Sequence, residues 1–78
     1  MPLFFLHVRD GGRLMRDPDG SCVHGLEAAR HEAIASAREL MAHSIVGEGR
    51  IGIERSIEIC DARGATVLVL PFRQAVAT

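Results

Sequence analysis

The chain has 78 residues and a formal net charge of −1 at pH 7; 47% of its residues are hydrophobic and 24% are charged. This length allows one small domain, residues 1–78, and the composition is that of an ordinary globular protein rather than a disordered tail. The charges are balanced and no apolar run approaches the roughly 20 residues that span a bilayer, so neither nucleic acid nor a membrane is an expected partner.

The first predicted element is a strand over residues 3–9, where side chains alternate with a period of two. One face would carry Phe4, Leu6 and Val8, and the opposite face Leu3, Phe5, His7 and Arg9. The Asp-Gly-Gly sequence at residues 10–12 is typical of a tight hairpin turn. We therefore expect a short return strand over residues 13–16, with Leu14 directed to the side of Phe4.

A helix is predicted after a second turn. The Asp-Pro-Asp-Gly sequence at residues 17–20 favours a turn, and residues 21–23 can extend the chain briefly along the sheet. The apolar period then becomes helical, with one stripe made of Leu26, Ala29, Ala33, Ala37, Leu40 and Met41. Because Gly47 and Gly49 are stop signals, we expect the helix to cover residues 26–46.

Two further strands are expected after the helix. Residues 51–60 alternate isoleucines with polar or small residues, which predicts a strand with one dry face. A loop at residues 61–64 leads into a last strand over residues 66–72, and Pro71 marks the end of that strand or an unpaired edge. Residues 73–78 are predicted to be a frayed tail.

The predicted fold is of the α+β class, with the order ββαββ. It comprises a four-stranded, mainly antiparallel sheet with one helix packed on one face. The helix stripe would meet Phe4, Leu6, Val8, Leu14, the isoleucines at 51, 53, 57 and 59, Leu68, Leu70 and Phe72. The sequence leaves open whether the middle strands are the first and fourth or the first and third.

Cysteine usage and the N-terminal residues indicate a compartment. Two cysteines, Cys22 and Cys60, are fewer than a disulfide-stapled secreted domain usually carries. The first ten residues have neither the basic segment nor the apolar segment of a signal peptide. We therefore expect a cytoplasmic protein with both thiols reduced.

Four segments carry a resemblance to a known family: FLHVRDG at residues 5–11, DPDG at 17–20, LEAARHEA at 26–33 and LVLPF at 68–72. Together they resemble a small alphaproteobacterial, rhizobial-type domain family of unknown function whose members start with an FHVRDG-like motif. The resemblance extends over nearly the whole chain. It implies a compact α+β domain, and it brings no activity, cofactor or catalytic residue with it.

Three residues have the chemistry of metal ligands. Cys22, His24 and His31 could each bind zinc, but a structural zinc site usually has four ligands in paired spacing, and no second cysteine pair is present. We therefore expect no metal and no cofactor.

His7 is the candidate for a catalytic group. A histidine can act as a general base, and Ser56 or Cys60 could lie on the same sheet face by parity. However, the chain has no nucleophile elbow of the G-x-S-x-G type and no oxyanion loop. We therefore interpret His7 as a structural or interface residue and expect no enzymatic activity.

A single helix cannot cover both faces of a four-stranded sheet. The uncovered face would carry an unusual mixture of apolar and polar side chains, and we predict that it forms an interface; its candidate residues are Leu3, Phe5, His7, Arg9, Val67 and Val69. A two-fold homodimer is the commonest way to cover such a patch. An unidentified protein partner is the other occupant that would fit.

The sequence thus favours a small, non-enzymatic interaction or regulatory domain that self-associates. One alternative is a nucleic-acid-associated regulator of the antitoxin type, which rests on fold analogy and is opposed by the balanced charge. The other is a small ligand-binding or enzymatic domain that uses His7.

Overall fold

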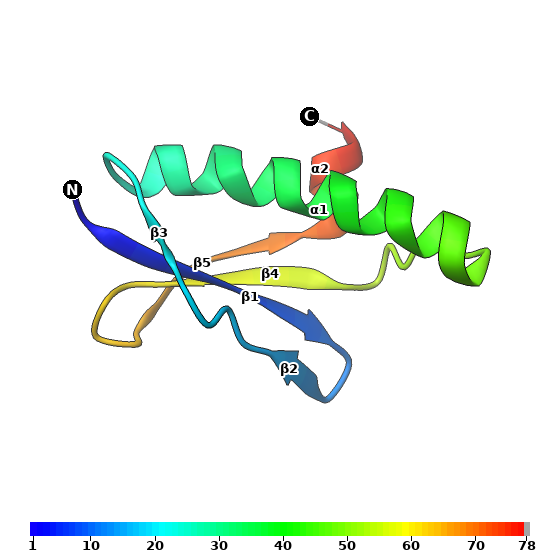
Figure 1. The fold of residues 1–78 in the computed structure, drawn as a ribbon, viewed down its shortest axis with the longest axis horizontal. Coiled ribbons are helices and arrows are strands. Elements are labelled where there is room, and N and C mark those ends of the chain that lie inside the picture. The colour runs from blue at the N-terminus through cyan, green and yellow to red at the C-terminus, as the bar shows by residue number, and fades with distance from the viewer. Residues whose placement is uncertain (78) are drawn as a thin grey trace.

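The alternation of residues 3–10 produces β1 (Leu3–Asp10), the longest strand of the sheet. The structure is a computed structural model that describes residues 1–77. After β1 come β2 (Arg13–Met15), β3 (Ser21–Cys22), α1 (Leu26–Glu48), β4 (Ser56–Cys60), β5 (Thr66–Pro71) and α2 (Phe72–Ala77). α1 lies along one face of the sheet, as Figure 1 shows.

The sheet is antiparallel throughout and has the order β2-β1-β4-β5, with β3 pairing to the other end of β1. The α+β class, the antiparallel sheet and the single main helix are as predicted. The sheet has five strands rather than four, because Ser21 and Cys22 pair with Phe4 and Leu3 as a strand of their own. The middle strands are β1 and β4, which correspond to the first and third predicted strands; the fourth predicted strand is the edge strand β5.

Small side chains let α1 lie close to the sheet. Ala29, Ala33 and Ala37 are fully buried, as the predicted apolar stripe requires. The helix continues to Glu48, slightly beyond the predicted end, and stops at Gly49, which adopts a left-handed φ of 73° and donates its N–H to the carbonyl of Ile45 at 3.0 Å.

The prediction for Leu14 was wrong. Met15 pairs with Val8 and Leu14 pairs with Arg9. Because paired residues share a face, Met15 lies on the side of α1 and Leu14 lies on the uncovered side with Arg9. The turn at residues 11–12 sets this register, and a shift by one residue exchanges the faces of the whole return strand.

The strand predicted over residues 51–60 is shorter than expected. It begins at Ser56, and residues 51–55 form a loop in which Gly52 adopts a left-handed φ of 68°. Arg55 fixes this loop: its guanidinium donates to the carbonyl oxygens of Gly52 and Ile51 and to the hydroxyl of Ser44. Ile51 is consequently exposed instead of facing the helix.

The predicted frayed tail is instead the short helix α2. Phe72 and Ala75 are fully buried there, and α2 packs against α1 and β5. The N–H of Phe72 donates to the carbonyl of Arg55 at 3.0 Å, and the Arg55 guanidinium lies 4.8 Å above the Phe72 ring. The C-terminal segment therefore completes the core; only Thr78 of the predicted tail lies outside the described residues.

Candidate functional site

The face of the sheet that α1 does not cover, called here the open face, carries the predicted interface residues. In β1, Phe5 pairs with Cys60, His7 with Glu58 and Arg9 with Ser56 of β4. Val69 continues the His7–Glu58 row into β5. The predicted residues differ in exposure: Val67 is 39% exposed, Val69 50% and His7 only 8%, while Leu3, Phe5 and Arg9 are half-buried. The accessible apolar surface thus lies on β5.

His7 has a structural partner within the chain. Its Nδ1 accepts a hydrogen bond of 2.9 Å from the backbone N–H of Asp17. Its ring stacks with that of Phe5, with ring centroids 6.1 Å apart. A ring nitrogen that accepts a hydrogen bond carries no proton, so neutral His7 has its proton on Nε2. His7 therefore holds the connection that follows β2 and offers little surface to a partner.

Asp17 organises the turn at residues 17–20. Its Oδ1 accepts hydrogen bonds of 3.1 Å from the N–H groups of Asp19 and Gly20, and its Oδ2 accepts one of 3.2 Å from the N–H of Leu6. Partial burial alone would raise the pKa of Asp17, but the hydrogen bonds from Gly20, Leu6 and Asp19 outweigh it and hold the pKa below its ordinary value. Between β2 and β3, the Asp17 carboxylate thus accepts the hydrogen bond from the Leu6 N–H that a backbone carbonyl of a neighbouring strand would otherwise accept.

Arg9 and Glu58 form an ion pair on the open face. The Arg9 Nε donates to the Glu58 Oε2 at 2.8 Å. This hydrogen bond, with the charge of Arg9, holds the pKa of Glu58 below its ordinary value, and the same bond raises the pKa of Arg9. The charges at this end of the open face are therefore paired with each other.

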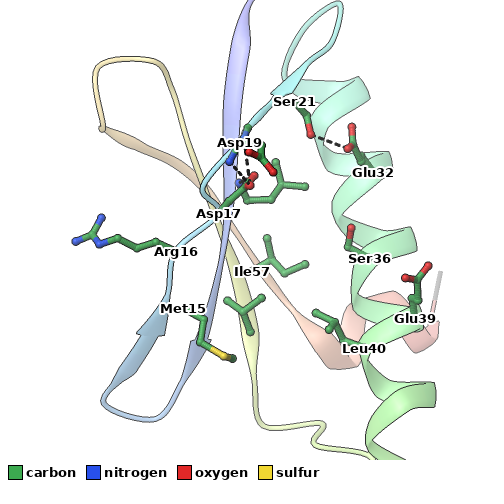
Figure 2. Close-up of a pocket in the computed structure, with 13 residues that line it drawn as sticks. Met15, Arg16, Asp17, Asp19, Ser21, Glu32, Ser36, Glu39, Leu40 and Ile57 are labelled. Carbon is green, nitrogen blue, oxygen red and sulfur yellow. Dashed lines mark hydrogen bonds between the residues drawn. The ribbon is translucent and has the colours of Figure 1, made fainter.

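A groove runs along the opposite side of the sheet, between α1 and the connection from β2 to β3 (Figure 2). Its volume is about 450 Å³, and its floor is apolar, made of Leu6, Val8, Met15, Leu40 and Ile57. The groove exists because α1 packs chiefly against β4, β5 and α2, which leaves the β2 side of the sheet less covered.

The walls of this groove are acidic. Glu32, Ser36 and Glu39 are spaced i, i+4 and i+7 on α1, so they share the side of the helix that borders the groove. Asp19 belongs to the opposite wall. Arg16 also lines the groove, but Figure 2 shows its guanidinium directed away from α1. The groove therefore combines an apolar floor with carboxylates along both sides.

The residues considered for metal binding are distributed over different elements. Cys22 is exposed in β3, His24 lies between β3 and α1, and the Nε2 of His31 on α1 lies 3.3 Å from Glu27. Within residues 1–77, no three His, Cys, Asp or Glu side chains are grouped so that they could hold a metal ion.

The candidate nucleophiles lie on the open face, as their parity predicted. Cys60 and His7 border the same shallow hollow, about 350 Å³ in volume, beside the β4–β5 loop. The Cys60 sulfur is buried and lies 3.6 Å from the Thr66 hydroxyl, which is its hydrogen-bond contact. Ser56 pairs with Arg9, which lies two residues beyond His7 in β1 and on the same face of the sheet. Within residues 1–77, the hydrogen-bond partner of His7 is the N–H of Asp17, and neither Ser56 nor Cys60 is hydrogen-bonded to it.

The groove was not found from the sequence. Its helical wall had a signal, the i, i+4, i+7 spacing of Glu32, Ser36 and Glu39, but such a row is also typical of a solvated helix face. The opposite wall depends on the turn that Asp17 ties to β1, and the floor includes Met15, whereas the sequence had placed Leu14 on that side of the sheet.

None of the helices within residues 1–77 is long and apolar enough to cross a bilayer.

Comparison with known proteins places the chain in a family. No curated protein and no solved structure gives a match. One family, described as a domain of unknown function, matches residues 3–73, which span β1 to the start of α2. The chain therefore belongs to the DUF6894 family of domains of unknown function.

Proposed function

We propose that this domain is a small, non-enzymatic interaction module that forms a homodimer through β5 and the adjoining open face. The observation that carries the proposal is the exposure of Val67 and Val69 on a strand whose outer edge has no partner within residues 1–77. An exposed edge strand of this kind presents unpaired N–H and C=O groups to another strand. The proposal includes a cytoplasmic location, which the low cysteine content favours.

The two edges of the sheet differ in a way that supports this choice. The β2–β3 edge carries Arg13, Arg16, Asp19 and Pro18, and the turn at residues 17–20 interrupts it. Charges, proline and irregular backbone all discourage strand addition. The segment 66–70 in β5 contains threonine, valine and leucine only. β5 also contains a proline, but Pro71 stands at its end and the preceding segment is uncharged, so β5 is the edge better suited to accept another strand.

A second copy is the occupant that fits. Two β5 strands related by a two-fold axis pair antiparallel, and each copy then contributes the same uncharged segment to the contact. Val67 and Val69 of both copies would then lie next to one another across the contact on the open face. The Arg9–Glu58 ion pair would lie beyond them as a polar margin.

The proposal is tested by measuring the molar mass of the protein in solution with light scattering after size exclusion. We expect a dimer for the wild type and a folded monomer for Val69→Glu, because the substitution places a carboxylate in the apolar contact. Val46→Glu is the matched control, since Val46 is 89% exposed on α1, away from β5. A monomeric wild type at high micromolar concentration, or a Val69→Glu protein that is still dimeric, would contradict the proposal.

A further inference from the structure

We propose that the groove between α1 and the β2–β3 connection binds an aliphatic polyamine, a linear chain of methylene groups that carries two or three ammonium groups. The groove lies on the α1 side of the sheet, whereas the proposed dimer contact lies on β5 and the open face. The inference therefore goes beyond the proposed function, and each proposal can fail without the other.

The carboxylates that line the groove differ in the number of hydrogen bonds that they already accept from the protein. Both oxygens of Asp17 accept backbone hydrogen bonds, so Asp17 serves the turn. Glu32 accepts one hydrogen bond of 2.7 Å from the Ser21 hydroxyl, which orients it across the groove. The carboxylates of Asp19 and Glu39 have no partner among residues 1–77. Three carboxylates are therefore available to cations.

The spacing of these carboxylates favours a linear ligand. Glu32 and Glu39 are seven residues apart on α1, which corresponds to about 10 Å along the helix axis. The terminal ammonium groups of an extended triamine are separated by a similar length. A divalent metal ion would require ligands that converge on one point, and within residues 1–77 no such group of side chains occurs.

The floor of the groove supplies the second part of the recognition. Met15 is exposed on it, Leu6, Val8 and Leu40 are half-buried, and Ile57 lies beneath. Methylene stems of a cationic chain pack well on apolar surface while the charged groups stay at the rim, as lysine stems do in proteins. Among the described residues that line the groove, Arg16 is the one basic residue, and its guanidinium points away from α1, so it does not occupy the position of the ligand.

The test is a titration with spermidine followed by the ¹H–¹⁵N amide signals of the protein. We expect saturable shifts at Asp19, Ser36 and Leu40, on the two walls and the floor. Each surface ion pair contributes only modestly to the binding free energy. The double variant Glu32→Gln/Glu39→Gln, which removes two of them, is therefore expected to bind spermidine about tenfold more weakly. Glu54→Gln, which removes an exposed carboxylate outside the groove, is the matched control and should bind like the wild type.

Two comparison ligands separate groove binding from general attraction between charges. Hexane-1,6-diol, which has methylene groups without charge, should cause no saturable shift at the groove. Mg²⁺ should cause weak shifts spread over acidic residues, because it cannot use the apolar floor. The proposal is overturned if spermidine shifts are spread in the same way as those of Mg²⁺, if they cluster elsewhere, or if Glu54→Gln weakens binding as much as the double variant.

Discussion

The backbone N–H of Asp17 donates a 2.9 Å hydrogen bond to the Nδ1 of His7, while the side chain of the same Asp17 accepts the N–H of Leu6. The turn is thereby tied to two successive residues of β1. Between the pairs Val8–Met15 and Phe4–Ser21, β1 advances four residues (8 to 4) and the opposite chain advances six (15 to 21). Asp17 fastens the two additional residues to the sheet, and the polar wall of the groove depends on that attachment.

The first prediction concerns the pH dependence of this attachment. The folded-state pKa of Asp17 is below its value in the unfolded chain, so its contribution to stability is present above the unfolded-state pKa and is lost as the pH falls through the folded-state pKa. At pH 7 we expect Asp17→Asn to lower the free energy of unfolding by about 1–2 kcal/mol. The amide oxygen of asparagine can still accept the N–H groups of Asp19 and Gly20, but its NH2 group cannot accept the N–H of Leu6, and the negative charge is lost.

Urea denaturation of both proteins at a series of pH values measures this effect. The difference between them should shrink as the pH falls below the ordinary carboxyl range, about pH 4. Asp10→Asn, at an exposed carboxylate at the end of β1, is the control and should change stability little at any pH. A difference between wild type and Asp17→Asn that stays constant down to acidic pH would show that the charge of Asp17 is not what stabilises the turn.

The second prediction concerns the protonation of the His7 ring. Since Nδ1 accepts the N–H of Asp17, the neutral ring should carry its proton on Nε2. Long-range ¹H–¹⁵N correlation spectra at neutral pH distinguish the two tautomers directly. We expect the Nε2–H form for His7. The Nδ1–H form at His7 would be incompatible with the bond to Asp17.

The sequence predicted the parts of the fold that depend on local periodicity. The alternation of Phe4, Leu6 and Val8, and the alanines at 29, 33 and 37, led to the correct faces of β1 and α1. The errors occurred where a contact between distant residues decides the conformation. Arg55 holds the loop before β4, and burial of Phe72 against α1 turns the expected tail into a helix. Such contacts between distant residues cannot be predicted from the periodicity of a single segment.

The candidate site was predictable to a smaller extent. Parity alone placed Val67 and Val69 on the open face, but the burial of His7 required the hydrogen bond from Asp17, ten residues later in the chain. The groove depends on the register of β2, which a shift by one residue would have reversed. Surface features that combine three elements therefore followed only from the structure.

A third prediction tests the role of α2. Phe72 is fully buried, and the Arg55 guanidinium lies 4.8 Å above its ring. Phe72→Leu should lower the free energy of unfolding by about 1–2 kcal/mol through lost volume and the lost cation–π contact. Arg73→Ala, at the exposed neighbouring position, should change it by less than roughly 0.5 kcal/mol. Chemical denaturation measures both stability changes. If Phe72→Leu changed the free energy of unfolding as little as Arg73→Ala, residues 72–77 would not belong to the core.

The last prediction compares two glycines that have the same backbone requirement and different surroundings. Gly52 and Gly64 both adopt left-handed conformations, with φ of 68° and 89°. An alanine at either position incurs about 1–2 kcal/mol of backbone strain. A methyl group at Gly64 meets no atom within 4 Å, whereas at Gly52 it would overlap the guanidinium of Arg55.

Gly52→Ala should therefore cost more stability than Gly64→Ala. To make room, the Arg55 guanidinium must leave the carbonyls of Gly52 and Ile51 and the hydroxyl of Ser44, which adds about 1 kcal/mol or more for lost hydrogen bonds. A double-mutant cycle isolates this contribution. In an Arg55→Ala background the overlap is gone, so Gly52→Ala should cost no more than Gly64→Ala does in the wild type. If Gly52→Ala costs the same with and without the Arg55 side chain, Arg55 does not hold this loop through Gly52.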